Sequence, residues 1–226
     1  SRVLTEAWQQ WRGLMSEPRR APVWNYFLWY RTLTHPRYPV FFTGALQEEM
    51  QQILPICDGK FIEIQPTRVT TPEGREEFRL NTPGLIHLMV YWQNKLFWDP
   101  DMDRKKMLDE YYTLFFGPAA AEMKEFIEFA EAVWMRQESR SVTLTTGFLK
   151  EPDVDRFFEI LARARARAGS DTVYARRIAR MQDEMLTLKD LFPNLARTGP
   201  LVRAYPVDIA WTGLDGDVSK YRYGWM

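Results

Sequence analysis

The stretch from Trp92 to Ala120 constrains the fold more than any other part of this 226-residue chain. It opens Trp92-Gln-Asn-Lys-Leu-Phe-Trp-Asp-Pro-Asp-Met-Asp103 and closes Asp109-Glu-Tyr-Tyr-Thr-Leu-Phe-Phe-Gly-Pro-Ala-Ala120. The Asp-Pro-Asp sequence favours a tight turn, and the Gly-Pro pair is suited to end one helix and begin the next. The stretch therefore predicts a helix, a turn, a second helix and the start of a third.

Apolar spacing extends this pattern into a series of helices. The expected helices cover residues 85–98, 103–116, 118–136, 153–168 and 171–191. Three of them begin at an aspartate that can cap the helix, namely Asp103, Asp153 and Asp171. In the helix over 153–168, three arginines alternate with alanines and fan around the helix axis (Arg163, Arg165 and Arg167). We interpret them as solvated or salt-bridged side chains and not as a nucleic-acid-binding stripe.

The first third of the chain predicts strands. Apolar segments over 23–30 and 60–65 have strand character, and a helix is expected over 44–53 between them. A strand, a helix and a strand in this order favour a βαβ unit with parallel strands. The polar stretch 66–84 is predicted to be a long loop with a functional role.

These elements resemble the family catalogued as domain of unknown function 4838, part of which overlaps glycoside hydrolase family 163. The likeness covers roughly residues 23–185 and is strongest in the Leu-Phe-Trp-Asp-Pro and Tyr-Tyr…Gly-Pro-Ala-Ala motifs. The resemblance implies an α/β fold, the C-terminal portion of a glycosidase-like (β/α)8 TIM barrel followed by a helical subdomain. It also implies a fragment of a longer protein that is secreted, periplasmic or on the cell surface.

Three segments follow from this interpretation. Residues 1–84 would hold the last βα units of the barrel, and residues 85–195 would form a helical region packed on it. Residues 196–226 would be a linker that leads into a β-sandwich module of the carbohydrate-binding type. The Asp-Gly-Asp sequence at 215–217 supports the module, although it is also an ordinary turn.

Composition excludes several classes of protein. Lys and Arg together number 30, as do Asp and Glu, so no net charge attracts nucleic acid or an anionic membrane. No segment approaches the ~20 apolar residues that span a bilayer. The single cysteine, Cys57, cannot form an internal disulfide and is predicted to be buried. No metal-ligand or phosphate-binding motif is present, so we expect neither a metal nor a cofactor.

The leading catalytic candidate is Glu63. In a strand over 60–65, Glu63 shares a face with Phe61 and Gln65. The resemblance places this strand seventh in the barrel, with Glu63 near the end where barrel enzymes hold catalytic groups. We expect Glu63 to be one of a pair of carboxylates in a retaining glycosidase, with the other upstream of this chain. The alternatives are a salt bridge to Arg68 or Arg31, and a substrate-assisted mechanism.

Substrate-binding candidates surround this position. Asn25 is the polar member of the first strand and could reach a sugar hydroxyl, while Trp29 and Tyr30 could stack on sugar rings or fill the core. His35, in the following loop, Gln65 and Arg68 complete the predicted set of substrate-binding residues. His87 lies in an apolar helix and is predicted to be a core residue.

Two functions are compatible with the sequence. The first is hydrolysis of N-acetylglucosamine-containing glycans, the endo-β-N-acetylglucosaminidase activity that the resemblance implies. The second is a catalytically silent barrel that binds carbohydrate or serves a structural role. The abundance of aromatic residues, 9 Trp, 10 Tyr and 14 Phe, is compatible with both, because such rings stack on sugars and also fill cores.

Overall fold

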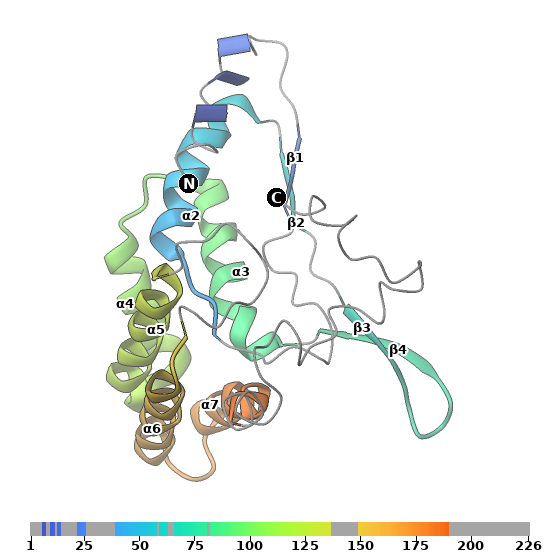
Figure 1. Cartoon of the computed structure of the whole chain (residues 1–226), viewed down its shortest axis with the longest axis vertical. Coiled ribbons are helices and arrows are strands. Elements are labelled where there is room, and N and C mark those ends of the chain that lie inside the picture. The colour runs from blue at the N-terminus through green and yellow to red at the C-terminus, as the bar shows by residue number, and fades with distance from the viewer. Residues whose placement is uncertain are drawn as a thin grey trace.

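The computed structural model describes residues 6–7, 10–11, 13–14, 22–25, 39–57, 59–62, 66–80, 82–136 and 149–189. These parts of the chain are mainly helical (Figure 1). The helices that follow the first strand are α2 (Thr43–Ile53), α3 (Pro83–Trp98), α4 (Arg104–Phe116), α5 (Ala120–Met135), α6 (Glu151–Ala168) and α7 (Val173–Glu184). Short 3-10 turns cover Leu54–Ile56, Gly117–Ala119 and Leu186–Leu188.

Strands form two separate two-stranded sheets. β1 (Val23–Asn25) pairs in parallel with β2 (Lys60–Ile62), and β3 (Pro66–Thr70) pairs antiparallel with β4 (Glu76–Leu80). The β3–β4 hairpin extends away from the helices (Figure 1). The parallel pair, with α2 between its strands in sequence, agrees with the local strand–helix–strand prediction.

The prediction of an α/β fold that contains a TIM-barrel fragment is wrong, because the described residues are mainly helical. Within the described ranges the strands do not join into one sheet, and the helices pack mainly on one another instead of covering a barrel. A short apolar run predicts a buried strand, but it does not determine how many strands share a sheet. The step from one βαβ unit to a barrel came from the family resemblance, and the structure does not support it.

The polar stretch after β2 is a hairpin and not the long loop that was predicted. Its turn closes where the Thr71 N–H donates to the Arg75 carbonyl oxygen at 2.8 Å and the Gly74 N–H donates to Thr71 O at 2.9 Å. Gly74 has φ of +77°, a conformation that glycine adopts without steric cost. Pro-Glu-Gly turn chemistry between two alternating segments was the local signal for this hairpin.

Local capping chemistry fixes the helix starts. Asp103 caps α4 as predicted, because its side chain accepts from the Lys106 N–H at 3.0 Å. The Gly-Pro sequence ends α4 and leads into α5, also as predicted. Two predicted caps are displaced: Asp153 is the third residue of α6, where it accepts from the Lys150 N–H, and Thr172 caps α7 in place of Asp171.

One hydrophobic core runs through the helices. α5 packs between α4 and α6, α6 packs on α7, α7 on α3, and α3 on α2. The largest fully buried side chains are aromatic, namely Phe41, Trp92, Phe116, Phe126 and Phe157. Burial of each removes a large apolar area from water, which makes these rings the main stabilising contacts. Helix α2, assigned to the first predicted segment, thus shares a core with helices of the second; the division of the chain into three segments stays a prediction.

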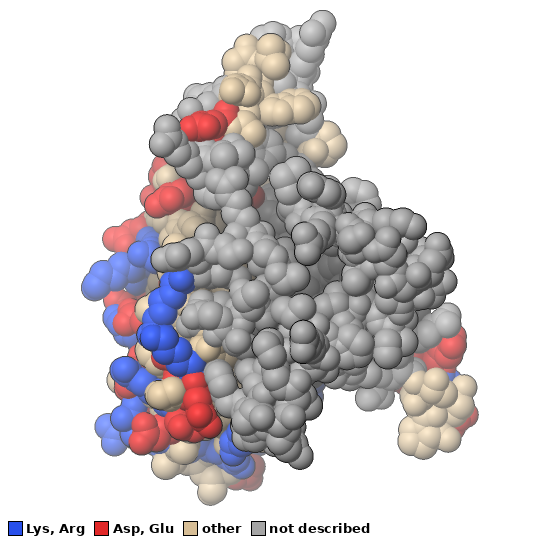
Figure 2. All heavy atoms as spheres, in the orientation of Figure 1, with Lys and Arg blue, Asp and Glu red and all other residues tan. Residues whose placement is uncertain are grey.

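Two further sequence predictions concern burial and membranes. Cys57 is buried, as predicted, and its thiol donates to the Gly59 carbonyl oxygen. Among the residues that the structure describes, no helix has the length and apolar character to cross a bilayer. Figure 2 shows acidic and basic side chains intermixed over the helices in view, without a large region of one sign.

Candidate functional site

Most of the predicted site lies outside the described residues. Glu63, Trp29, Tyr30, His35 and Gln65 all fall there, and so does the tail over 196–226. Only the backbone is described for the two remaining members. Asn25 pairs with Ile62 in the parallel sheet, and Arg68 pairs with Phe78 in the hairpin, so these two belong to different sheets.

Two carboxylates of the described helices that are largely covered have structural partners. Glu131 of α5 accepts from the Thr43 hydroxyl at 3.0 Å and from the Gly44 N–H at 3.3 Å, and Arg104 lies 4.0 Å away. The carboxylate therefore satisfies one free N–H group at the start of α2, where the helix dipole also favours negative charge.

Glu184 accepts hydrogen bonds from N–H groups at the start of α3 in the same way. Its carboxylate oxygens accept from the Gly84 N–H at 3.1 Å and the Leu85 N–H at 3.0 Å, and Arg180 donates to it at 2.7 Å. Both acids are held by several donors and cap helices distant in sequence. Neither is presented to a substrate as a catalytic acid or nucleophile would be.

The outward face of α3 carries the best candidate for a binding site. At 100° per residue, five side chains fall within one arc on the side opposite the buried Leu85, Trp92 and Leu96. We call this set the α3 stripe; its members are His87, Tyr91, Asn94, Lys95 and Trp98. It spans about 16 Å along the helix, from the rise of ~1.5 Å per residue. Trp98 is 90% exposed.

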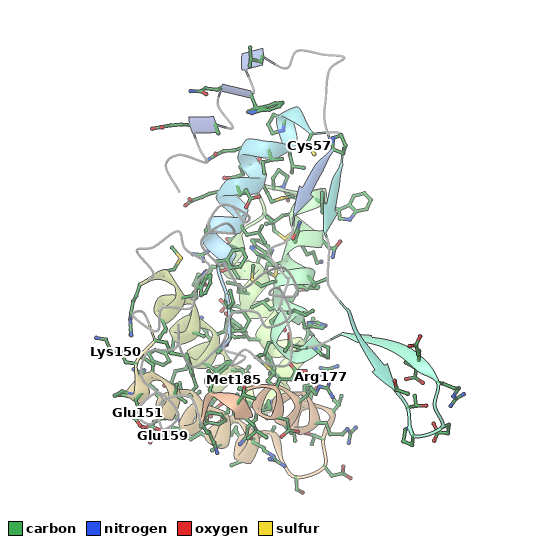
Figure 3. All side chains as sticks on the ribbon, turned by 45° about the vertical axis from the view of Figure 1, so that its right-hand side comes forward. Cys57, Lys150, Glu151, Glu159, Arg177 and Met185 are labelled. Atoms are coloured by element: carbon green, nitrogen blue, oxygen red, sulfur yellow. The ribbon has the colours of Figure 1, made fainter. Side chains whose placement is uncertain are left out.

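Neighbouring helices fix the first residue of the α3 stripe. The His87 ring stacks on Phe115 of α4 with centroids 4.2 Å apart, and its Nδ1 lies 3.3 Å from the Tyr111 hydroxyl. Arg177 of α7 lies over the Phe115 ring at 4.1 Å and donates to the Phe115 carbonyl oxygen at 2.7 Å. Figure 3 labels Arg177 where α7 meets the start of α3. His87 is thus exposed but held in one orientation.

Electrostatics around this histidine favour its neutral form. Partial desolvation lowers the pKa of His87, and the nearby Arg177 guanidinium lowers it further. Burial raises the pKa of Tyr111 far above its ordinary value, so its hydroxyl stays protonated. The pair therefore presents a neutral imidazole edge that can donate or accept a hydrogen bond at neutral pH.

The middle of the α3 stripe combines an aromatic ring with polar groups. Tyr91 is half-buried, with its ring 5.5 Å from Tyr111, and Lys95 lies over the Tyr91 ring at 5.4 Å. Asn94 is exposed and its amide donates to the Val90 carbonyl oxygen at 2.8 Å. Together with Trp98, these side chains offer ring faces for stacking and several hydrogen-bonding groups beside them.

The prediction that His87 lies in the core is wrong, because its side chain is exposed and stacks at the edge of α4. The spacing 87, 91, 95 and 98 was the available signal, because these positions share one helix face. The signal was difficult to recognise because aromatic residues occur on both faces of this segment. The adjacent Tyr91 and Trp92 show this, since Tyr91 is half-buried and Trp92 is fully buried.

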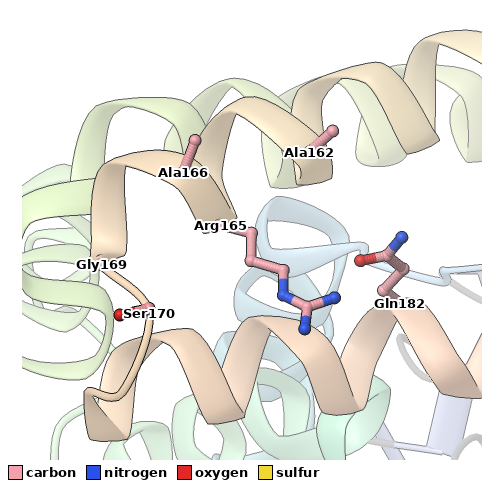
Figure 4. Close-up of a pocket in the computed structure, with 6 residues that line it drawn as sticks. All are labelled: Ala162, Arg165, Ala166, Gly169, Ser170 and Gln182. Atoms are coloured by element: carbon pink, nitrogen blue, oxygen red, sulfur yellow. The ribbon is translucent and has the colours of Figure 1, made fainter.

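A groove lies between α6 and α7. It is an open groove of about 500 Å³ lined by Ala162, Arg165, Ala166, Gly169, Ser170 and Gln182 (Figure 4). Within the described ranges, no group of three or more His, Cys, Asp or Glu side chains is arranged to hold a metal ion.

Comparisons with protein-family models, with curated proteins and with solved structures gave no match for this chain. The resemblance to the domain of unknown function 4838 family therefore stays a prediction.

Proposed function

We propose that this chain binds glycans and that the α3 stripe is the binding face. One observation carries the proposal: Trp98, 90% exposed, shares the outward face of α3 with Tyr91. Isolated exposed apolar residues are common on proteins. Here the two rings stand beside Asn94, Lys95 and His87, which supply hydrogen-bonding groups on the same face.

The chemistry of sugars matches such a face. One side of a pyranose ring presents C–H groups that pack against an aromatic ring, and its hydroxyls need both donors and acceptors. An acetamido group, as in N-acetylglucosamine, adds one further donor and one acceptor. The balanced charge of the chain suits a neutral ligand of this kind.

Calorimetry tests the proposal with the full 226-residue chain and N,N′-diacetylchitobiose as the probe. We expect Trp98→Ala to weaken binding about tenfold, or ~1.4 kcal/mol, because it removes the exposed stacking surface. Trp98→Phe should retain most of the affinity, since a ring remains. Met135→Ala is the matched control, because Met135 is also an exposed apolar side chain (60%) but lies at the end of α5.

Two results would oppose the proposal. If the unaltered chain shows no heat of binding with the disaccharide, the stripe is not a site for this class of glycan. If Trp98→Ala and Met135→Ala lower the affinity equally, the effect does not come from the α3 stripe. Binding of a protein partner that Trp98→Ala abolishes, without glycan binding, would identify the stripe as a protein-docking face.

Hydrolysis is the second candidate function, and it rests on the family resemblance alone. In this proposal Glu63 is a carboxylate of a retaining glycosidase that acts on an N-glycan, and the protein is secreted or held at the cell surface. The test is hydrolysis of an N-glycan glycopeptide by the protein with and without Glu63→Gln. A folded variant with a rate lowered well beyond tenfold supports the role, and equal rates exclude it.

A further inference from the structure

The groove between α6 and α7 has the composition of a binding site separate from the α3 stripe. Its α6 wall consists of small residues, Ala162 and Ala166, and Gly169 continues it at the end of the helix. Small side chains allow a ligand to approach the helix backbone closely. Figure 4 shows Arg165 extending from α6 toward α7, and Gln182 extending from α7 toward α6.

Arg165 differs from the neighbouring arginines of α6. Arg156 and Arg163 pair with Glu125 of α5, and Arg167 lies 4.0 Å from Glu122, which is also in α5. Arg165 faces the other side of α6 and has no ion-pair partner among the described residues. A guanidinium without an ion-pair partner offers a fork of N–H donors that matches the geometry of a carboxylate.

Gln182 lines the same groove from the α7 side. The last turn of α6 ends in carbonyl groups that lack helical N–H partners. Among the described residues, the Thr172 hydroxyl donates to the carbonyl oxygen of Ala168. The other carbonyl groups of this turn can accept hydrogen bonds from a ligand.

We propose that this groove binds a small hydroxylated carboxylate, of which a uronic acid is the model ligand. The carboxylate would pair with the Arg165 guanidinium, and ring hydroxyls would donate to the open carbonyl groups at the end of α6. A bare anion satisfies only the first contact, and a neutral sugar only the second. The combination therefore sets the selectivity.

An NMR titration of the 15N-labelled full chain tests this site. We expect D-glucuronate to shift the amide signals of Gly169 and Ser170 saturably, because both residues line the groove. D-glucose lacks the carboxylate and acetate lacks the hydroxyls, so each should bind at least tenfold more weakly. Arg165→Gln should weaken glucuronate binding at least tenfold.

The control is Arg163→Gln, which removes the same charge from the same helix but on the side that faces Glu125. It should leave glucuronate affinity unchanged, and unshifted signals elsewhere in both variants show that the fold is intact. Absence of a saturable shift at Gly169 and Ser170 overturns the proposal. So does acetate binding as tight as that of glucuronate, or equal affinity of the Arg165→Gln variant.

Discussion

At the scale of single residues, two carboxylates that are largely covered stabilise the starts of other helices. Glu131 and Glu184 each bring a carboxylate from a distant helix to the N–H groups that begin another one. Such contacts fix the relative positions of α2, α3, α5 and α7, because a helix start and its capping acid must stay together. The α3 stripe is held in place by this arrangement.

His87 should report the electrostatics of the α3 stripe. Its folded-state pKa is lowered from the ordinary 6.5 by desolvation and by Arg177, so the unfolded chain takes up a proton at higher pH than the folded chain. The contribution of His87 to stability is therefore complete above pH 6.5 and is lost as pH falls through the lowered folded-state pKa.

NMR titration of the His87 ring protons measures this pKa directly. We expect Arg177→Gln to raise it toward 6.5, because the repulsion between the guanidinium and the imidazolium is removed. Glu159→Gln, a change on the exposed surface of α6, should leave it unchanged. A folded-state pKa for His87 at or above 6.5 in the unaltered protein contradicts the described environment.

At the scale of elements, two glycines allow the cost of backbone strain to be compared with the cost of overpacking. Gly74 in the hairpin and Gly117 between α4 and α5 both have positive φ, +77° and +54°. A Cβ at position 74 would meet nothing within 4 Å, whereas one at position 117 would lie 2.6 Å from the Tyr174 ring.

We expect Gly74→Ala to lower the free energy of unfolding by ~1 kcal/mol, from backbone strain alone. Gly117→Ala should lower it by a further ~1–3 kcal/mol, because the new methyl group overpacks against Tyr174. Urea denaturation of both variants gives the comparison. Equal losses would mean that Tyr174 moves aside without cost.

Local signals predicted the elements that depend on local chemistry. The helices over 85–98, 103–116 and 118–136 were expected because Asp-Pro-Asp, Asp103 and Gly-Pro act within a few residues. The start of α6 lies three residues before the predicted cap, because Asp153 accepts from the Lys150 N–H from within the first turn. The cap of α7 shifted by one residue, because the Thr172 hydroxyl accepts from the Ala175 N–H. The hairpin was missed because its polar composition resembled a loop.

At the scale of the whole molecule, the sequence was least informative. Strand–helix–strand order determines one unit, but the association of units depends on long-range packing that periodicity does not contain. The helices instead bury one another around Trp92, Phe116 and Phe126. Most residues of the predicted site lie outside the described ranges, so that site stays a prediction. The α3 stripe could be recognised only once the core face of α3 was known.

Mapping of the glycan on the protein tests this account most directly. The 15N-labelled chain would be titrated with N,N′-diacetylchitobiose, and the amide shifts followed residue by residue. Binding at the α3 stripe predicts saturable shifts centred on residues 87–98, with little change in α5 and α6. Saturable shifts centred elsewhere, or no shift at millimolar disaccharide, would contradict glycan recognition by this face.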